Sequence, residues 1–300
     1  MTVNNKRDAT IGTLGVHYKK INDDLSNTTI DPIQLGEILK KLKNQKRENV
    51  IMEAASHGLE QNRLDGLIFN IGIFTNLSHD HLDYHKNLKN YLKAKLYLFR
   101  KLIRKKGNII TDSKIPEFNQ IKKIAKKKYL KFNALENKNE KLKILTHSFQ
   151  DESQILKIKY NNIIEDIKFN LIGKIQIKNI LMALIAAEKS GLKLKKILRV
   201  IPNLKPVEGR FEKIGMIKNK SKVILDYAHT PEALKTCLVN LKEQFPDKKI
   251  ISLFGCGGNR DQNKRSIMGK IADTFSDEIY ITDDNPRFAN TNTIRRDITM

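Results

Sequence analysis

The sequence predicts an α/β protein in which a mainly parallel sheet is flanked by helices. Two observations support this prediction: short apolar runs alternate with amphipathic helical segments, and the alternation restarts after a stretch bounded by Pro202 and Pro206. A chain of 300 residues is long enough for about two domains of ~100–200 residues each. We therefore expect a first domain over residues 1–206 and a truncated, Rossmann-like second domain over residues 207–300.

In the first domain, apolar runs of strand length separate segments whose apolar residues recur at helical spacing. The predicted strands cover residues 50–53, which we expect to be buried, 67–77 and 107–111; the predicted helices cover 31–43, 88–105, 117–128 and 178–190. Residues 155–160 and 164–170 flank an Asn-Asn turn, which predicts a hairpin. Gly191 provides a C-terminal stop for the last helix.

In the second domain the same alternation continues. Strands are predicted over residues 222–226, 249–254 and 278–283, and helices over 231–244 and 265–274. Pro231 suits the first turn of its helix. The pattern up to Met300 indicates one more helix. Since three strands are few for a doubly wound sheet, we expect this domain to be cut short.

Composition narrows the class of protein. No apolar run approaches the ~18–20 residues that span a bilayer, and the N-terminus lacks the apolar centre of a signal peptide. Two cysteines are too few for a disulfide framework, so we expect a cytoplasmic protein without membrane insertion. A monomer is the expected oligomeric state.

The net charge of +23 raises the question of nucleic-acid binding. The lysines are spread along the whole chain, however, whereas a nucleic-acid module more often has clustered Lys and Arg with interleaved aromatic residues. We therefore expect no nucleic-acid partner and interpret the charge as attraction for an anionic small substrate.

A first candidate site lies where the strand at residues 50–53 ends. Open α/β sheets bind ligands at such strand ends, and a carboxylate there, Glu53, is a natural Mg²⁺ ligand. His81, in a loop with two aspartates, could add a further ligand. Taken alone, Glu53 could equally be a capping carboxylate and His81 a histidine satisfied by hydrogen bonds.

Several motifs in a fixed order resemble the Mur ligases, the ATP-dependent amino-acid ligases of peptidoglycan synthesis. Those of the first domain resemble the family's central domain, and the remainder continue in the family's order. They are Glu53-x-x-Ser56-His57-Gly58-Leu59-x-Gln61-x-Arg63, Thr75-Asn76-Leu77-x-x-Asp80-His81-Leu82-Asp83-Tyr84-His85, Tyr91-x-x-Ala94-Lys95, Gly209-Arg210-Phe211-Glu212, Asp226-Tyr227-Ala228-His229-Thr230-Pro231, Phe254–Arg265 and Asp283-Asp284-Asn285-Pro286-Arg287.

The resemblance implies which residues bind the metal ion and the muramoyl-peptide substrate. Lys95 is expected to be carbamylated, which turns a cation into a carboxylate that can sit beside Mg²⁺; without its neighbours it would be an ordinary helix-face lysine. Glu53, His81 and carbamylated Lys95 are the implied catalytic residues, with Glu53 and His81 as metal ligands. The implied contacts to the muramoyl-peptide substrate are Asn27, Thr28, Thr29, Ser56, Gln61 and Arg63. Asn27-Thr28-Thr29 is also compatible with a simple N-cap, and Ala55 stands where the family often has a serine.

The resemblance also implies residues for the incoming amino acid and for ATP. Arg260, Asp284, Asn285, Pro286 and Arg287 would bind the amino acid. An arginine at Arg287 resembles the meso-diaminopimelate-adding type, because a guanidinium pairs with the distal carboxylate that lysine lacks; a surface arginine is the alternative. Asn179, Arg210, Asp226 and His229 match positions near ATP, although each could be only a cap.

The implied reaction uses ATP and Mg²⁺ to convert the D-glutamate γ-carboxylate of UDP-N-acetylmuramoyl-L-alanyl-D-glutamate into an acyl phosphate, which the amine of meso-diaminopimelate then takes up. The family's Gly-Lys-Thr-Thr phosphate loop has no counterpart here, and Gly12-Thr13-Leu14-Gly15 lacks the lysine. We therefore expect an internal piece of a longer enzyme, inactive by itself. The alternatives are a lysine-adding or folylpolyglutamate-type ligase, or a non-catalytic substrate-binding remnant.

Overall fold

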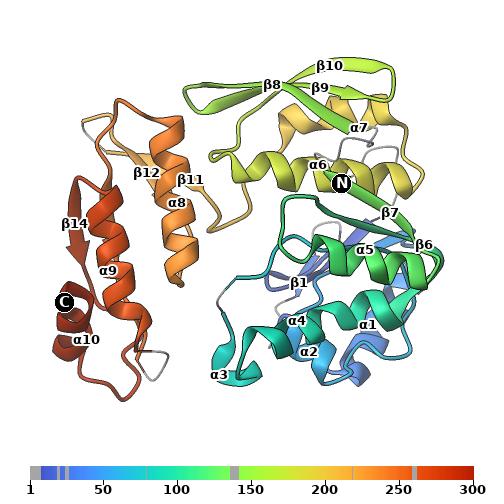
Figure 1. The fold of residues 1–300 in the computed structure, drawn as a ribbon, viewed down its shortest axis with the longest axis horizontal. Helices are drawn as coiled ribbons and strands as arrows, with labels where there is room; N and C mark the ends of the chain where they lie inside the picture. The colour runs from blue at the N-terminus through green and yellow to red at the C-terminus, as the bar shows by residue number, and fades with distance from the viewer. Residues whose placement is uncertain are drawn as a thin grey trace. The chain divides into compact units, whose positions relative to one another are not determined.

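In the computed structural model, the chain forms two compact units, which are described here one at a time (Figure 1). The structure describes residues 8–18, 21–23, 27–78, 80–135, 142–217, 219–258 and 262–300. The first unit comprises residues up to 77, 85–142 and 181–200, and the second comprises 78–84, 143–180 and 201–300. Within the described residues, no helix is both long and apolar enough to cross a bilayer.

A four-stranded sheet in the order β3-β2-β1-β4 forms one part of the first unit. Its strands are β1 (Asp8–Gly12), β2 (Gly15–Tyr18), β3 (Ile21–Asp23) and β4 (Asn49–Met52). β1 pairs in parallel with β4 and antiparallel with β2. Helix α1 (Pro32–Asn44) packs Leu35 and Leu42 into the same core as Ile11. This sheet and helix α1 are therefore held together by apolar side chains from the strands and from one face of the helix.

The N-terminus of α1 is capped by Asp31 and not by the Asn27–Thr29 segment. The Asp31 carboxylate accepts from the backbone N–H groups of Ile33 and Gln34, both at 3.0 Å. Asp is among the best N-cap residues. The threonines before it are consequently available for contacts elsewhere.

A second, parallel sheet of the first unit has the order β5-β6-β7. β5 (Phe69–Ile73), β6 (Ile103–Asp112) and β7 (Lys131–Leu135) are covered by α4 (Leu88–Tyr97) and α5 (Phe118–Lys127). Ile109 and Ile110 in the central strand are fully buried, as is usual for a parallel sheet with covered faces. The unit also contains the short helix α2 (Ser56–Glu60) and helix α7 (Leu194–Val200).

Two predicted elements of this sheet have different ends. The strand expected over 67–77 is limited to β5, and the helix expected over 88–105 stops at a π-helical turn, η1 (Leu98–Leu102). Ile103 instead starts β6, where it pairs with Phe69 and packs with Phe99 in the core. Strand pairing and burial of a β-branched side chain outweigh the helical periodicity there.

The strand predicted over 50–53 exists as β4, but the expectation that it is buried was wrong. Val50 is 38% and Ile51 46% exposed. The reason is position: β4 is the last strand of its sheet and pairs only with β1. Its other edge faces a cavity.

The second unit begins with the short helix α3 (Leu82–His85), which ends at the boundary with the first unit, and contains three small sheets. β8 (Leu142–Gln150), β9 (Ser153–Tyr160) and β10 (Ile163–Phe169) form a meander, which confirms the predicted hairpin. β11 (Glu212–Met216) pairs antiparallel with β12 (Lys222–Leu225), whereas β13 (Ile251–Phe254) and β14 (Glu278–Ile281) are parallel. Only the last pair matches a Rossmann-like arrangement.

The predicted helices of this part are present as α6 (Ile175–Lys189), which the two units share, α8 (Pro231–Gln244), α9 (Lys264–Phe275) and α10 (Thr291–Thr299). α8, α9 and α10 pack around β13–β14 through Leu238, Met268 and Ile298. Gly191 ends α6 in the left-handed conformation, with φ of 90°, as predicted.

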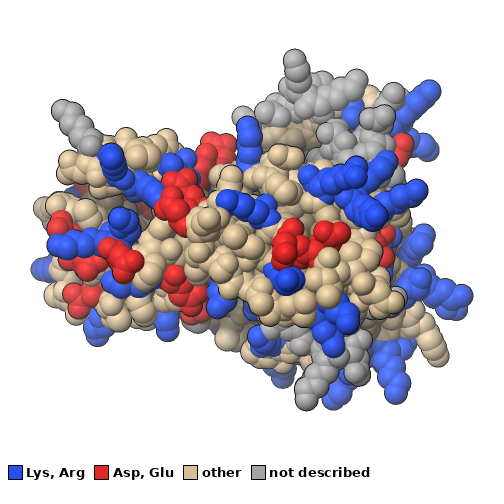
Figure 2. Space-filling view, turned by 90° about the horizontal axis from the view of Figure 1, so that it is seen from above, with Lys and Arg blue, Asp and Glu red and all other residues tan. Residues whose placement is uncertain are grey.

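Figure 2 shows lysine and arginine side chains distributed over much of the visible surface, with acidic side chains between them. The charge of the chain is thus spread over many elements on that face.

Candidate active site

Glu53 follows the end of β4 and is held there by the turn between β1 and β2. Its Oε2 accepts from the backbone N–H of Thr13 at 2.9 Å and from the Thr13 hydroxyl at 2.8 Å. A Cβ on Gly12 would lie 2.9 Å from the same oxygen, so the glycine permits this close approach. The Thr13 and Thr28 hydroxyl oxygens are 3.0 Å apart. The Glu53 carboxylate is therefore oriented by two donors of Thr13, although Glu53 is itself exposed.

Thr29 holds the backbone that leads from Glu53 into α2. Its buried hydroxyl donates to the Glu53 carbonyl at 3.2 Å and accepts from the Ala55 N–H at 2.9 Å. Gly58 lies against its side chain, because a Cβ there would be 2.4 Å from Thr29 Cγ2. Arg63 Nη1 donates to the Thr29 carbonyl at 2.7 Å. Thr29 thus contacts Glu53, Ala55, Gly58 and Arg63, which all lie in or beside the quoted motif.

Ser56, at the start of α2, contacts a buried histidine that links it to the exposed Glu60. His85 Nε2 lies 2.9 Å from Ser56 Oγ, and His85 Nδ1 lies 2.9 Å from Glu60 Oε2. The imidazole stacks on Tyr91, with ring centroids 5.0 Å apart. Ser56 is only 7% exposed, and its hydroxyl contacts His85. The position of this hydroxyl is therefore fixed inside the protein.

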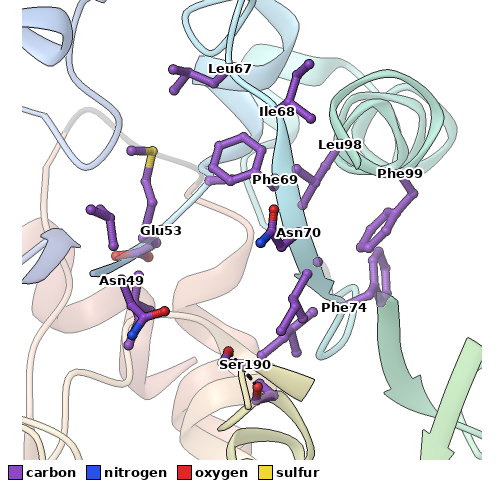
Figure 3. A pocket seen from close by; sticks show the side chains of 18 of the residues that line it. Asn49, Glu53, Leu67, Ile68, Phe69, Asn70, Phe74, Leu98, Phe99 and Ser190 are labelled. Carbon is purple, nitrogen blue, oxygen red and sulfur yellow. Dashed lines mark hydrogen bonds between the residues drawn. The ribbon is translucent and has the colours of Figure 1, made fainter. Parts of the chain in front are cut away.

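Lys95 projects from α4 towards the end of β5. Its Nζ donates to the Asn76 carbonyl at 2.8 Å and lies over the rings of Phe74 and Tyr91, 5.1 and 5.4 Å from their centroids. Carbonyl oxygens and aromatic faces favour a cation. Glu53 and Lys95 line the same cavity of about 740 Å³ in the first unit. Figure 3 shows Glu53 on one side of this cavity and Asn70 of β5 on the other.

His81 is assigned to the second unit, and it contacts other predicted residues there. Its backbone is left-handed, with φ of 55°, and its N–H donates to Asp80 Oδ1 at 2.8 Å. Asp80 Oδ2 lies 3.5 Å from His81 Nε2 and 3.8 Å from His229 Nε2. Asp80 thus connects a predicted metal ligand to a predicted ATP contact. Left-handed histidine is uncommon, which is consistent with a conformation imposed by this loop.

Arg210, Asp226 and His229 meet around Tyr227. The Arg210 guanidinium lies 5.2 Å from the Tyr227 ring centroid, and the His229 ring is 5.3 Å from it. Asp226 Oδ2 accepts from the Phe211 N–H at 3.0 Å. Burial raises the pKa of Asp226, partly offset by that hydrogen bond and by Arg210. Three of the four residues predicted near ATP are therefore neighbours.

The fourth, Asn179, lies apart from that group. It is exposed on α6, and its Nδ2 donates to Gln176 Oε1 at 3.3 Å. This contact within one helix gives no independent sign of a ligand site.

The loop after β13 packs directly on the loop after β14. A Cβ on Gly258 would lie 1.8 Å from the Pro286 carbonyl oxygen, and one on Gly255 would lie 2.4 Å from the Thr282 carbonyl oxygen. The Gly258 N–H donates to the Asn285 carbonyl at 2.9 Å. These glycines are required because only residues without Cβ allow the two backbones to meet.

This contact determines how the predicted amino-acid residues are presented. Arg287 is left-handed, with φ of 51°, and its N–H donates to Asn285 Oδ1 at 3.0 Å. Asp284, Asn285 and Arg287 are exposed. Arg260, the remaining predicted residue of this group, lies outside the described residues.

Other residues that position the site could not be found by sequence reasoning. Thr13 is an ordinary turn residue, 40 positions from the carboxylate that it holds. His85 and Asn76 occur in the quoted motifs, but nothing in the sequence indicates that they contact Ser56 and Lys95. Among the described residues, no three His, Cys, Asp or Glu side chains come together as a metal site.

Two protein-family domains match the segments that contain these motifs. The Mur ligase middle domain matches residues 2–187, and the domain described as "Mur ligase, glutamate ligase domain" matches residues 209–300. This chain belongs to the Mur ligase family. The first unit and α6 hold most of the middle-domain match, and β11 to α10 hold the second match.

Named relatives within the Mur ligase family are similar along the whole chain. The UDP-N-acetylmuramoyl-L-alanyl-D-glutamate--2,6-diaminopimelate ligases of Rickettsia typhi and of Buchnera aphidicola subsp. Schizaphis graminum are each 38% identical over 98% of this chain. The match covers 60% and 59% of those proteins. The chain thus spans about three fifths of the length of these relatives.

Solved structures agree with the Mur ligase fold. A structure of a UDP-N-acetylmuramoyl-L-alanyl-D-glutamate--2,6-diaminopimelate ligase has a TM-score of 0.71 and 28% identity, covering 98% of this chain and 59% of that one. The MurF ligase of Thermotoga maritima in complex with ADP has a TM-score of 0.70 at 17% identity, covering 93% and 61%. Apo L. casei FPGS has the same score at 11% identity, covering 97% and 77%. The last two show the fold alone.

The Thr29 contacts give a stability prediction. Thr29→Val keeps the shape of the side chain but leaves the Ala55 N–H without its acceptor, so we expect the free energy of unfolding to fall by about 1–3 kcal/mol. Thr75→Val is the matched control: that threonine is exposed, and we expect a change within about 0.5 kcal/mol. Urea denaturation followed by circular dichroism measures both. Equal stability of the two variants would contradict the assigned role of Thr29.

Proposed function

We propose that this chain supplies the central and amino-acid-binding parts of an ATP-dependent ligase that adds meso-2,6-diaminopimelate to UDP-N-acetylmuramoyl-L-alanyl-D-glutamate. The observation that supports this most strongly is similarity to ligases of that name along 98% of the chain. The oriented Glu53 carboxylate, the Lys95 amine and the exposed Arg287 loop are groups that such a reaction needs. We also propose a division into residues 1–206 and 207–300, a cytoplasmic location and a monomeric state.

In this proposal Glu53 and His81 hold or orient Mg²⁺, which neutralises phosphate charge when it is bound. The chemistry of the donors fits, because Glu53 offers a hard oxygen at a strand end and Mg²⁺ usually keeps several waters. Thr13 already occupies Oε2, and this leaves Oε1 for a cation. Arg210, Asp226 and His229 would bind ATP, together with Asn179.

The muramoyl-peptide substrate is assigned to the residues around α2. The set consists of Asn27, Thr28, Thr29, Ser56, Gln61 and Arg63, whose amide, hydroxyl and guanidinium groups can donate to substrate oxygens. In the structure, Thr29 and Ser56 are both buried and both used in internal hydrogen bonds. We therefore assign these two to positioning the loop, and the other four members of the set to contacts with the substrate itself.

The choice of amino acid is assigned to the loop after β14. A guanidinium can pair bidentately with the distal carboxylate of diaminopimelate, whereas lysine has no carboxylate there. The left-handed backbone and the Asn285 contact fix the direction in which Arg287 leaves the loop. Arg260 and Asp284 would share this pocket. A lysine-adding ligase is the second candidate, and Arg287 argues against it.

The specificity can be tested in a chimera. Replacing the matched 298 residues of the Rickettsia typhi ligase by this chain should give ATP-dependent phosphate release with the muramoyl-dipeptide and meso-diaminopimelate, and much less with lysine. Arg287→Ala should lower kcat/KM for diaminopimelate about 10–100-fold, the value of a lost charged hydrogen bond.

Arg296→Ala, an exposed arginine on α10, is the control and should leave kcat/KM unchanged. Equal use of lysine by the chimera, together with no effect of Arg287→Ala, would overturn the specificity assignment. The 300-residue chain alone should release no phosphate above background, since it contains no Gly-Lys-Thr-Thr run.

Carbamylation of Lys95 can be observed directly. Because the Asn76 carbonyl and two aromatic rings favour the ammonium form, we expect the carbamate to accumulate only when Mg²⁺ is present to ligate it. Carbon-13 NMR of the chain equilibrated with ¹³C-bicarbonate and Mg²⁺ should show a carbamate resonance that Lys95→Arg removes and Lys89→Arg, on the same helix, retains. A spectrum unaffected by Lys95→Arg would refute the assignment.

A further inference from the structure

Two short segments at the starting ends of β6 and β7 consist entirely of cations. Residues 104–106 are Arg-Lys-Lys and residues 126–128 are Lys-Lys-Lys, and all six side chains are exposed. β6 pairs in parallel with β7, with Asn108 opposite Lys131, so both segments lead into neighbouring strands at the same edge of the sheet. Helix α5, which ends in the second segment, lies beside these strands (Figure 1). We call residues 104–106 and 126–128 the basic edge.

The first segment of the basic edge bulges out of the sheet. Four residues of β6 lie between Ile103 and Asn108, whereas on β5 only one residue lies between the partners of these two. A Cβ on Gly107 would lie 2.9 Å from the Asn70 carbonyl oxygen, so the glycine lets the chain return closely to the neighbouring strand. The three cations before it are therefore held out at the end of the sheet.

No carboxylate neutralises the basic edge. Asp112 and Glu117 are the only acidic residues between positions 101 and 131. Asp112 ends β6 and Glu117 precedes α5, so both lie at the opposite edge of the sheet. Among the ion pairs of the described part of the chain, none includes a cation of the basic edge. An anionic partner would relieve the repulsion among these six like charges.

Tyr129 follows the basic edge in an unusual conformation. It comes directly after the last turn of α5 with φ of 54°, and it is 75% exposed. Glycine or asparagine is usual at this position, because a bulky left-handed residue is strained. The nearest aromatic residues in the sequence, Phe118 and Phe132, pack on each other instead, with ring centroids 5.5 Å apart. A strained and exposed aromatic residue beside a basic surface indicates a contact outside the chain.

An anionic lipid surface fits these features better than a nucleic acid does. Five of the six cations are lysines, which act as point charges, whereas bases are read by the planar groups of arginine, asparagine and glutamine. Single strands stack successive bases on several aromatic side chains, and of the aromatic residues within 118–132 only Tyr129 is exposed. Clusters of about four to eight Lys and Arg bind anionic phospholipids, and tyrosine is enriched at the level of the headgroups.

We propose that the basic edge and Tyr129 form a docking surface for an anionic phospholipid bilayer, on which the chain lies without insertion. The cations contact headgroup phosphates, and the Tyr129 ring lies among the headgroups. This surface leaves the candidate site free, because Lys95 contacts the Asn76 carbonyl, which lies beyond the opposite ends of the same parallel strands. The inference is independent of the proposed ligase reaction.

The test is co-sedimentation of the 300-residue chain with lipid vesicles. Phosphatidylethanolamine vesicles that contain about one third phosphatidylglycerol should bind the chain at ~0.1 M salt, whereas phosphatidylcholine vesicles should not. Salt at ~1 M should release it, because the Debye length falls from ~10 Å to ~3 Å. Inorganic phosphate at the phosphate concentration of the lipid should leave the chain bound; release would indicate a site for a single phosphate and would overturn the lipid surface.

Matched variants locate the binding surface. The first variant neutralises the lysines at the end of α5: Lys126→Gln, Lys127→Gln and Lys128→Gln. Its vesicle binding should be about 100-fold weaker, or about fivefold for each cation. The control neutralises three exposed lysines of the second unit: Lys235→Gln, Lys248→Gln and Lys270→Gln. Its net charge is the same, and its binding should change less than about threefold, because charges away from the lipid surface are screened.

Tyr129→Gly tests the aromatic contact while the fold is kept, because glycine is favoured at a left-handed helix end. It should weaken vesicle binding about tenfold without lowering the midpoint of urea denaturation. Absence of binding to the anionic vesicles, or equal losses in the two triple variants, would overturn the docking surface. Release of the chain by a short DNA duplex at equal phosphate concentration would also overturn it and would indicate a nucleic-acid partner. None of these measurements uses ligase activity, so their failure leaves the proposed function untouched.

Discussion

The candidate site residues around the end of β4 depend on two hydrogen bonds of the Thr29 hydroxyl. It bonds to the backbone on both sides of the turn that follows β4, to the Glu53 carbonyl and the Ala55 N–H. A buried N–H without an acceptor is costly, so this threonine fixes the direction in which the chain leaves the sheet. Glu53 before the turn and Ser56 after it are both placed as a result. Arg63 and Gly58 then pack on Thr29, and this couples the whole of α2 to the end of the strand.

In the second unit, a loop is positioned by glycines instead of by a side-chain hydrogen bond. Gly255 and Gly258 allow the loop after β13 to touch the loop after β14, backbone against backbone. The exposed Asp284, Asn285 and Arg287 are therefore presented by a rigid support, although they carry few contacts of their own. In the first unit the exposed Glu53 is followed by backbone that the buried Thr29 holds, and in the second unit the exposed Arg287 lies in a loop that packs on two glycines.

Sequence reasoning located the elements well where periodicity and turn chemistry agreed, as at α5, α8 and the β9–β10 hairpin. It failed where a non-local contact decided the outcome. Ile103 leaves a helical pattern to pair with Phe69, and Val50 and Ile51 are exposed because β4 has only one partner. Neither fact is encoded in a local window of sequence.

The candidate site shows the same division. Glu53, Lys95 and Arg287 could be named from motifs, because their chemistry is visible in the residue type. Thr13 and the Asn76 carbonyl could not, since their roles arise from distances that the fold creates. The Asp80 contact between His81 and His229 likewise joins segments about 150 positions apart, as loop closure in the fold permits.

The central claim is that both ligand-facing loops are held by backbone contacts before any ligand binds. Residue-resolved amide hydrogen exchange of the 300-residue chain, without nucleotide or substrate, tests it most directly at Ala55 and Gly258, whose N–H groups bond to Thr29 Oγ1 and to the Asn285 carbonyl. We predict that both amides exchange as slowly as those within the adjacent strands β4 and β13. Exchange at the rate of an unstructured peptide at either amide would contradict the account.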